Sequence, residues 1–98
     1  MVNQPLDWRG KTSEGVVASV IGSVVVLQAN PRRKLATIQN DSASTMYLCK
    51  DDTAIVNRGI RLNPNGGVYE INLTNPYLGI LSIACTVAAQ NIMWTEDE

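Results

Sequence analysis

The segment Asn30–Asp52 reads NPRRKLATIQNDSASTMYLCKDD and sets the pattern on which the fold depends. A turn dipeptide and a basic cluster lead into the strand-like run Leu35–Asn40. Small polar residues then separate that run from a second one, Thr45–Lys50. Short runs rich in β-branched and aromatic residues, bounded by turn signals, are typical of strands in all-β domains. The segment therefore predicts two short strands joined by a turn.

The same alternation of turns and short apolar runs continues on both sides of this segment. Turn signals such as GKTSEG, NPNGG and TNPYLG punctuate the chain, and no long window has the 3.6-residue period of a helix. The sequence predicts an all-β fold, a single small antiparallel β-sandwich or barrel of about seven or eight strands with an N-terminal arm. The expected strands are Gly15–Ile21, Ser23–Ala29, Leu35–Asn40, Thr45–Lys50, Gly59–Leu62, Val68–Leu73, Leu78–Thr86 and Ala88–Thr95.

The ends of the chain differ in character from its middle. Residues 1–14 mix Pro5, Leu6 and Trp8 with charged residues and have no strand period, which predicts an arm. Residues 15–95 are expected to form the β-sandwich domain, and residues 96–98 an acidic tail. The arm has two possible positions, folded back on its own domain or docked on another subunit.

The turn in GIRLNPNGGVYEI predicts a hairpin between the strands on either side of it. Pro64 suits the first corner, Asn65 the second, and Gly66 supplies a positive φ, which is typical of a hairpin with a bulge.

The composition argues against an enzyme and against a metal site. The 98 residues include no histidine, so the usual general base and the commonest metal ligand are missing. The chain has two cysteines, Cys49 and Cys85, in apolar runs 36 residues apart, and they predict buried free thiols rather than a zinc site or a disulfide. No phosphate-binding glycine motif occurs. We therefore expect no catalysis and no cofactor.

Charge and hydropathy also limit the partners. The net charge is −1, so no broad basic surface is expected for nucleic acid. The apolar run Val16–Leu27 is too short for a membrane-spanning helix, which needs about 20 residues. Arg32, Arg33 and Lys34 form the densest charge cluster. They fit either a contact with phosphate or carboxylate groups, or a solubilising loop that guards a sheet edge.

The order of the segments resembles a family of small β-sandwich proteins encoded by tailed bacteriophages. The resemblance rests on the apolar strand ending in ANPRR, the strand ending in IQNDS, the YL strand, GIRLNPNGGVYE and the closing GILSIA, from about Val24 to Ala84. It implies that Gln39 and Asn40 satisfy backbone groups where their strand ends. It also implies that Arg61 and Glu70 pair across the predicted hairpin.

The resemblance further implies a non-enzymatic structural protein of a bacteriophage virion. The first expectation is a capsid decoration or cement protein, made in the cytoplasm of the bacterial host and bound to the capsid surface. The alternative is a tail- or fibre-associated sandwich that binds a host receptor or a carbohydrate. Expected partners are the major capsid protein or other virion subunits and further copies of the chain, with a trimer as first guess. The predicted partner-binding residues are Pro5, Leu6, Trp8, Arg9, Arg32 and Arg33.

Overall fold

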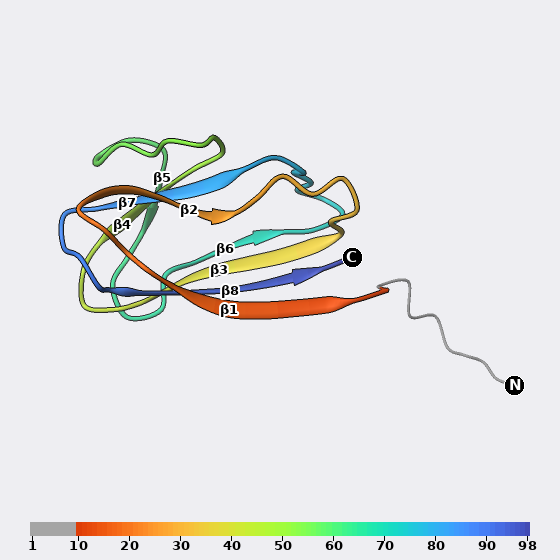
Figure 1. Ribbon diagram of the computed structural model, residues 1–98, viewed down its shortest axis with the longest axis horizontal. Coiled ribbons are helices and arrows are strands. Elements are labelled where there is room, and N and C mark those ends of the chain that lie inside the picture. The colour runs from red at the N-terminus through yellow and green to blue at the C-terminus, as the bar shows by residue number, and fades with distance from the viewer. Residues whose placement is uncertain (1–9) are drawn as a thin grey trace, which may run out of the picture.

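Within residues 10–98, eight β-strands form two four-stranded sheets (Figure 1). The computed structural model describes residues 10–98, and these form antiparallel sheets with the strand orders β1-β8-β3-β6, here called sheet A, and β2-β7-β4-β5, here called sheet B. The predicted all-β sandwich is confirmed. The strands are β1 (Thr12–Ala18), β2 (Gly22–Leu27), β3 (Leu35–Asp41), β4 (Met46–Cys49), β5 (Ile60–Leu62), β6 (Val68–Ile71), β7 (Leu81–Cys85) and β8 (Asn91–Asp97).

The chain passes back and forth between the two sheets. Among the described strands, β4 and β5 are the only two that follow each other in the same sheet. Strand orders 1-8-3-6 and 2-7-4-5 are those of a jelly roll, in which two Greek keys interlock. Most sheet hydrogen bonds consequently join residues that are far apart in the sequence.

Each of the eight predicted strands overlaps one observed strand, but the predicted domain limits shift. Strand β1 begins at Thr12 and β8 ends at Asp97, and these two residues are paired. Glu98 donates its backbone N–H to the Lys11 carbonyl, which extends the pairing by one step. Residues 12–14 of the predicted arm and residues 96–98 of the predicted tail therefore belong to the sandwich.

The predicted hairpin between β5 and β6 is wrong. Strand β5 pairs with β4 in sheet B, whereas β6 pairs with β3 in sheet A, so Arg61 and Glu70 lie in different sheets. The turn itself has the expected geometry, because Asn65 and Gly66 both have positive φ. It connects the sheets instead of folding the chain on itself, which lets Leu62 and Ile71 face the same core from opposite sides.

The core lies between the sheets and is almost entirely aliphatic. Alternate residues of each strand point inward, as the burial pattern of β3 shows for Ala36, Ile38 and Asn40. Each fully buried Leu, Ile or Met contributes about 1.5–3 kcal/mol relative to exposure. The buried cluster comprises Val26, Leu27, Ala36, Ile38, Met46, Leu48, Leu62, Ile71, Leu81, Ile83, Cys85 and Ile92.

The two thiols are free, as predicted, but they differ in environment. Cys85 is a buried core residue whose Sγ lies 3.7 Å from the Thr45 carbonyl oxygen, whereas Cys49 is only half-buried. Cys49 follows Leu48, which faces the core, so it points to the other side of sheet B.

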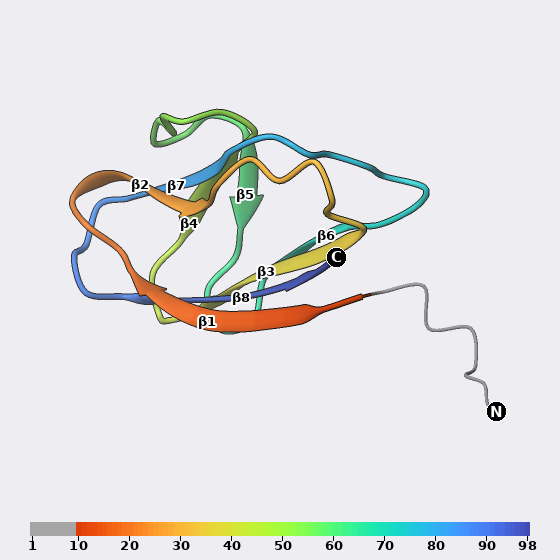
Figure 2. The same cartoon turned by 45° about the vertical axis from the view of Figure 1, so that its right-hand side comes forward.

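The outer face of sheet B is covered by the β4–β5 connection, residues 50–59, here called the strap (Figure 2). Ser82 Oγ donates to the Asp51 carbonyl at 2.8 Å, and the Ala54 N–H donates to Ser23 Oγ at 2.9 Å. The outward residues Ser82 and Ala84 are small enough for the strap to lie on them, and both are buried. No helix in residues 10–98 is long and apolar enough to cross a membrane.

Candidate functional site

The predicted partner-binding residues fall into two groups. Pro5, Leu6, Trp8 and Arg9 lie outside the described residues, 10–98. Arg32 and Arg33 are adjacent in the β2–β3 turn but have different surroundings. The Arg32 side chain is 79% exposed, whereas that of Arg33 is 0% exposed.

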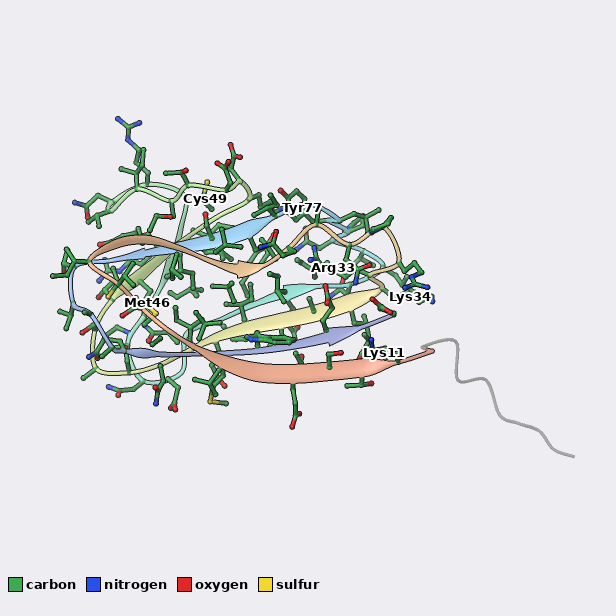
Figure 3. All side chains as sticks on the ribbon, viewed as in Figure 1. Lys11, Arg33, Lys34, Met46, Cys49 and Tyr77 are labelled. Atoms are coloured by element: carbon green, nitrogen blue, oxygen red, sulfur yellow. The ribbon has the colours of Figure 1, made fainter. Side chains whose placement is uncertain are left out.

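Arg33 is a structural residue at one end of the core. Its Nε donates to Glu96 Oε2 at 2.7 Å, and its Nη2 donates to the Gln28 carbonyl at 2.7 Å. Its Nη1 donates to the carbonyls of Tyr77 and Gly79, each at 3.0 Å. The expectation that Arg33 contacts a partner is therefore corrected, because burial and four internal hydrogen bonds commit its guanidinium to the fold (Figure 3).

A basic pocket of about 570 Å³ lies beside Arg33, at the end of the sandwich where Lys11 and Lys34 project (Figure 3). Glu98 lies in it, accepting from Asn30 Nδ2 at 2.7 Å, and Arg32 Nη2 is 3.9 Å from its other carboxylate oxygen. The Asn30 hydrogen bond is the main cause that holds the pKa of Glu98 below its ordinary value, with smaller contributions from the nearby cations. The pocket thus already holds a carboxylate of the same chain.

The outer face of sheet A carries a row of four side chains, one from each strand, of which three are apolar and the β3 member, Gln39, is polar; it is here called the apolar row. Val16 is paired with Met93, Met93 with Gln39, and Gln39 with Val68. Their side chains point away from the core, and Val16 is 62% and Val68 51% exposed. With strands about 4.8 Å apart, the row is about 14 Å long. No described segment covers it, in contrast to the strapped face of sheet B.

The charges on this outer face are all negative. The strands of sheet A read TSEGVVA, NIMWTED, LATIQND and VYEI, and they contain no lysine or arginine. Glu14, Asp41 and Glu70 are exposed at outward positions on three different strands. One row of this face runs Glu14–Thr95–Thr37–Glu70, directly beside the apolar row. The face is therefore an apolar strip bordered by carboxylates.

The same face has a hollow of about 290 Å³ between β8, β3 and β6. Thr37 lies at its middle, paired with Thr95 on one side and Glu70 on the other. Hydroxyl groups and a carboxylate around a small hollow suit a cationic side chain.

Tyr69, Tyr77 and Trp94 pack against the core, and the two tyrosines also make internal hydrogen bonds. Lys50 Nζ lies 5.4 Å from the Tyr69 ring centre and 5.5 Å from that of Tyr77, a cation–π geometry. Tyr77 Oη donates to backbone carbonyls, and Asn75 Nδ2 donates to Tyr69 Oη at 3.0 Å. Burial raises the pKa of Tyr69, but the hydrogen bonds from Lys50 and Asn75 and the Lys50 charge lower it by more.

Trp94 packs against the core next to β1, where Gly15 is its partner. A methyl group at Gly15 would lie 2.9 Å from the indole ring, so the glycine makes room for it. Trp94 and Tyr77 are two aromatic residues that a sugar-binding site would use. Both rings pack against the core and do not form an exposed stacking surface.

Three comparisons, with family models, with curated proteins and with solved structures, find no significant match to this chain. In residues 10–98, no three Cys, Asp or Glu side chains gather to hold a metal ion. Sequence reasoning missed the acidic and apolar face. The signal was present in β1, where Glu14, Val16 and Ala18 alternate with inward residues.

Proposed function

We propose that this protein is a non-enzymatic structural component of a tailed-bacteriophage virion, a decoration protein that binds the exterior of the head. The observation that carries the proposal is the difference between the two sheet faces. The strap covers the outer face of sheet B, whereas sheet A leaves Val16, Met93 and Val68 exposed in one row. A protein that works by surface contact needs such a face.

The resemblance of Val24–Ala84 to small phage sandwich proteins supports placing that contact on a virion. Jelly rolls recur in viral capsid proteins and in lectins, so the strand order is compatible with both expected functions. The environment of the aromatic residues favours capsid decoration over carbohydrate binding. Tyr69, Tyr77 and Trp94 are half-buried and partnered within the chain, so they offer no stacking surface for a sugar.

Many copies on one particle would make a weak individual contact sufficient. Binding of one copy next to another is favoured by a high local concentration, so avidity replaces affinity at each site. Because neighbouring copies on a particle lie close together, we also propose that the protein self-associates, with a trimer as first guess. Sedimentation equilibrium at micromolar concentration checks this, and a single 10.7 kDa species contradicts it.

Electron microscopy of intact particles, together with mass spectrometry of purified heads and tails, tests the function. We expect the protein in the head fraction, with density over the junctions between capsomers. Density confined to the tail tip contradicts decoration and supports the receptor-binding alternative. Absence of the protein from both fractions contradicts both functions.

A further inference from the structure

We propose that the outer face of sheet A docks onto another virion protein, at a surface where lysine or arginine side chains border an exposed apolar ridge. This inference rests on the proposed function and adds the face that binds and the chemistry of the partner.

The apolar row distinguishes this face from the rest of the described surface. Val16, Val68 and Met93 are the exposed large apolar residues that lie within described strands, and all three belong to one row. The other exposed large apolar residues lie in connections, namely Val20, Ile21, Ile55, Leu73, Leu78 and Val87. Side chains aligned on one sheet face, even with the polar Gln39 between Met93 and Val68, bury more apolar area against a partner than side chains scattered over turns.

Charge complementarity selects the partner. Glu14, Asp41 and Glu70 border the strip, and no cation lies in the strands beneath it. Burying these carboxylates against an apolar or acidic surface would remove their hydration without replacing it. A partner with lysine or arginine side chains at the border of the strip compensates the negative charges of these carboxylates. Such charge pairs increase the rate of association and the specificity of binding. The hollow beside Thr37 and Glu70 can accept one such side chain.

A second copy is a poorer occupant of this face. Face-to-face pairing would bring the carboxylates of Glu14 and Glu70 toward those of the other copy, and like charges at an interface cost several kcal/mol. Head-to-tail pairing would use either the basic pocket, whose Arg32 already interacts with Glu98, or the separate exposed cations Lys50, Arg58 and Arg61 on the sheet B side. These contacts favour a different, basic protein surface.

Zero-length cross-linking of purified intact particles tests the partner. A carbodiimide couples a carboxylate to a lysine amine only when the two groups touch. We expect cross-linked peptides that join Glu14, Asp41 or Glu70 to lysines of another virion protein. Cross-links from these residues to Lys11, Lys34 or Lys50 of a second copy would overturn the choice of partner. Cross-links to another protein only from Asp51 and Asp52, on the strap, would overturn the choice of face.

Two matched pairs of variants test the face in a binding experiment with heads purified from particles that lack this protein. Glu70→Lys is compared with Asp52→Lys, since both reverse one exposed carboxylate, on the face and on the strap respectively. Met93→Lys is compared with Ile21→Lys, since both replace an exposed apolar residue, in the row and in the β1–β2 connection. Circular dichroism confirms that each variant is folded.

We expect the two face variants to weaken binding to the heads at least about tenfold, and the two control variants by less than about twofold. Binding of the unaltered protein should fall as NaCl rises from 50 to 500 mM, because exposed ion pairs are screened. Equal effects of face and control variants, or no effect of salt, overturn the docking face while leaving the decoration function intact. If the unaltered protein does not bind to the heads and is also absent from intact particles, both the docking face and the decoration function are overturned.

Discussion

Arg33 and Glu96 form a buried ion pair that ties the β2–β3 turn to the last strand of the fold. Nε of the arginine and Oε2 of the glutamate are 2.7 Å apart, and the arginine side chain has no solvent exposure. The remaining guanidinium hydrogens reach the carbonyls of Gln28, Tyr77 and Gly79. One side chain thus joins three segments at an end of the sandwich that the aliphatic core does not fill.

Replacing Arg33 should therefore unfold the protein much more readily than replacing its neighbour. Arg33→Ala leaves the Glu96 carboxylate and three carbonyls without their donor and should lower the free energy of unfolding by about 3–5 kcal/mol. Arg32→Ala removes an exposed charge whose ion pair with Glu98 is long, at 3.9 Å, and should change the free energy of unfolding by less than about 0.5 kcal/mol. Urea denaturation followed by circular dichroism measures both. Similar small losses for the two variants would show that the network contributes little.

Asn40 should be the most sensitive asparagine of those described. It is fully buried, and its Nδ2 lies 2.6 Å from the Ser44 carbonyl oxygen, 3.1 Å from that of Leu62 and 3.2 Å from that of Asn63. Asn40→Ala removes all three contacts, including the buried hydrogen bond to the Leu62 carbonyl, and should cost about 2–3 kcal/mol. Asn91→Ala, at an exposed position of β8, is the control and should be nearly neutral. Thermal unfolding of the two variants distinguishes them.

Two glycines with positive φ should respond differently to the same substitution. Gly22 has φ 106° and open space around the missing Cβ, so Gly22→Ala should cost about 1 kcal/mol of backbone strain. Gly59 has φ 84°, and a Cβ there would overlap the carbonyl oxygen of Leu48. Gly59→Ala should therefore cost clearly more than Gly22→Ala, because β4 must move. A chemical denaturation midpoint that is the same for both variants would contradict the overlap.

Glu98 should titrate below its ordinary pKa of 4.5 in the folded protein. Because the folded pKa is the lower one, the stability that this group contributes is present above pH 4.5 and is lost as the pH falls through the folded value. Asn30→Ala removes the hydrogen bond from Nδ2 and should raise the pKa of Glu98 toward 4.5. NMR titration of the side-chain carboxyl carbon measures this, with Asn91→Ala as a control that leaves the pKa unchanged.

The existence of the strands was predictable because alternation of apolar and small residues, and the turn residues at each end, are visible within a short stretch of sequence. Leu81, Ile83 and Cys85 alternate with Ser82 and Ala84, and turn residues mark both ends of the run. The role of Asn40 in satisfying backbone groups was implied by the resemblance, and the structure confirms it.

The pairing of strands was not predictable in the same way. Nothing near GIRLNPNGGVYEI shows that β5 pairs with β4 and β6 with β3, since each choice depends on partners elsewhere in the chain. Arg33 was misread for the same reason. Its partner Glu96 is 63 residues away, and an arginine beside Arg32 and Lys34 has the sequence pattern of a surface cluster. The apolar row likewise requires the register of four strands.

The place of β8 in sheet A has a consequence for how the chain folds. This strand lies between β1 and β3 and pairs with both along its whole length, although it follows the other seven described strands in the chain. Sheet A therefore cannot close before β8 has been made, because the inward residues of β1 and β3 pack beside Ile92 and Trp94 of that strand. Sheet A should close only after residue 97 leaves the ribosome, whereas sheet B does not include β8. Folding should also be slow for a domain of this size, because nearly all of its strand contacts are non-local.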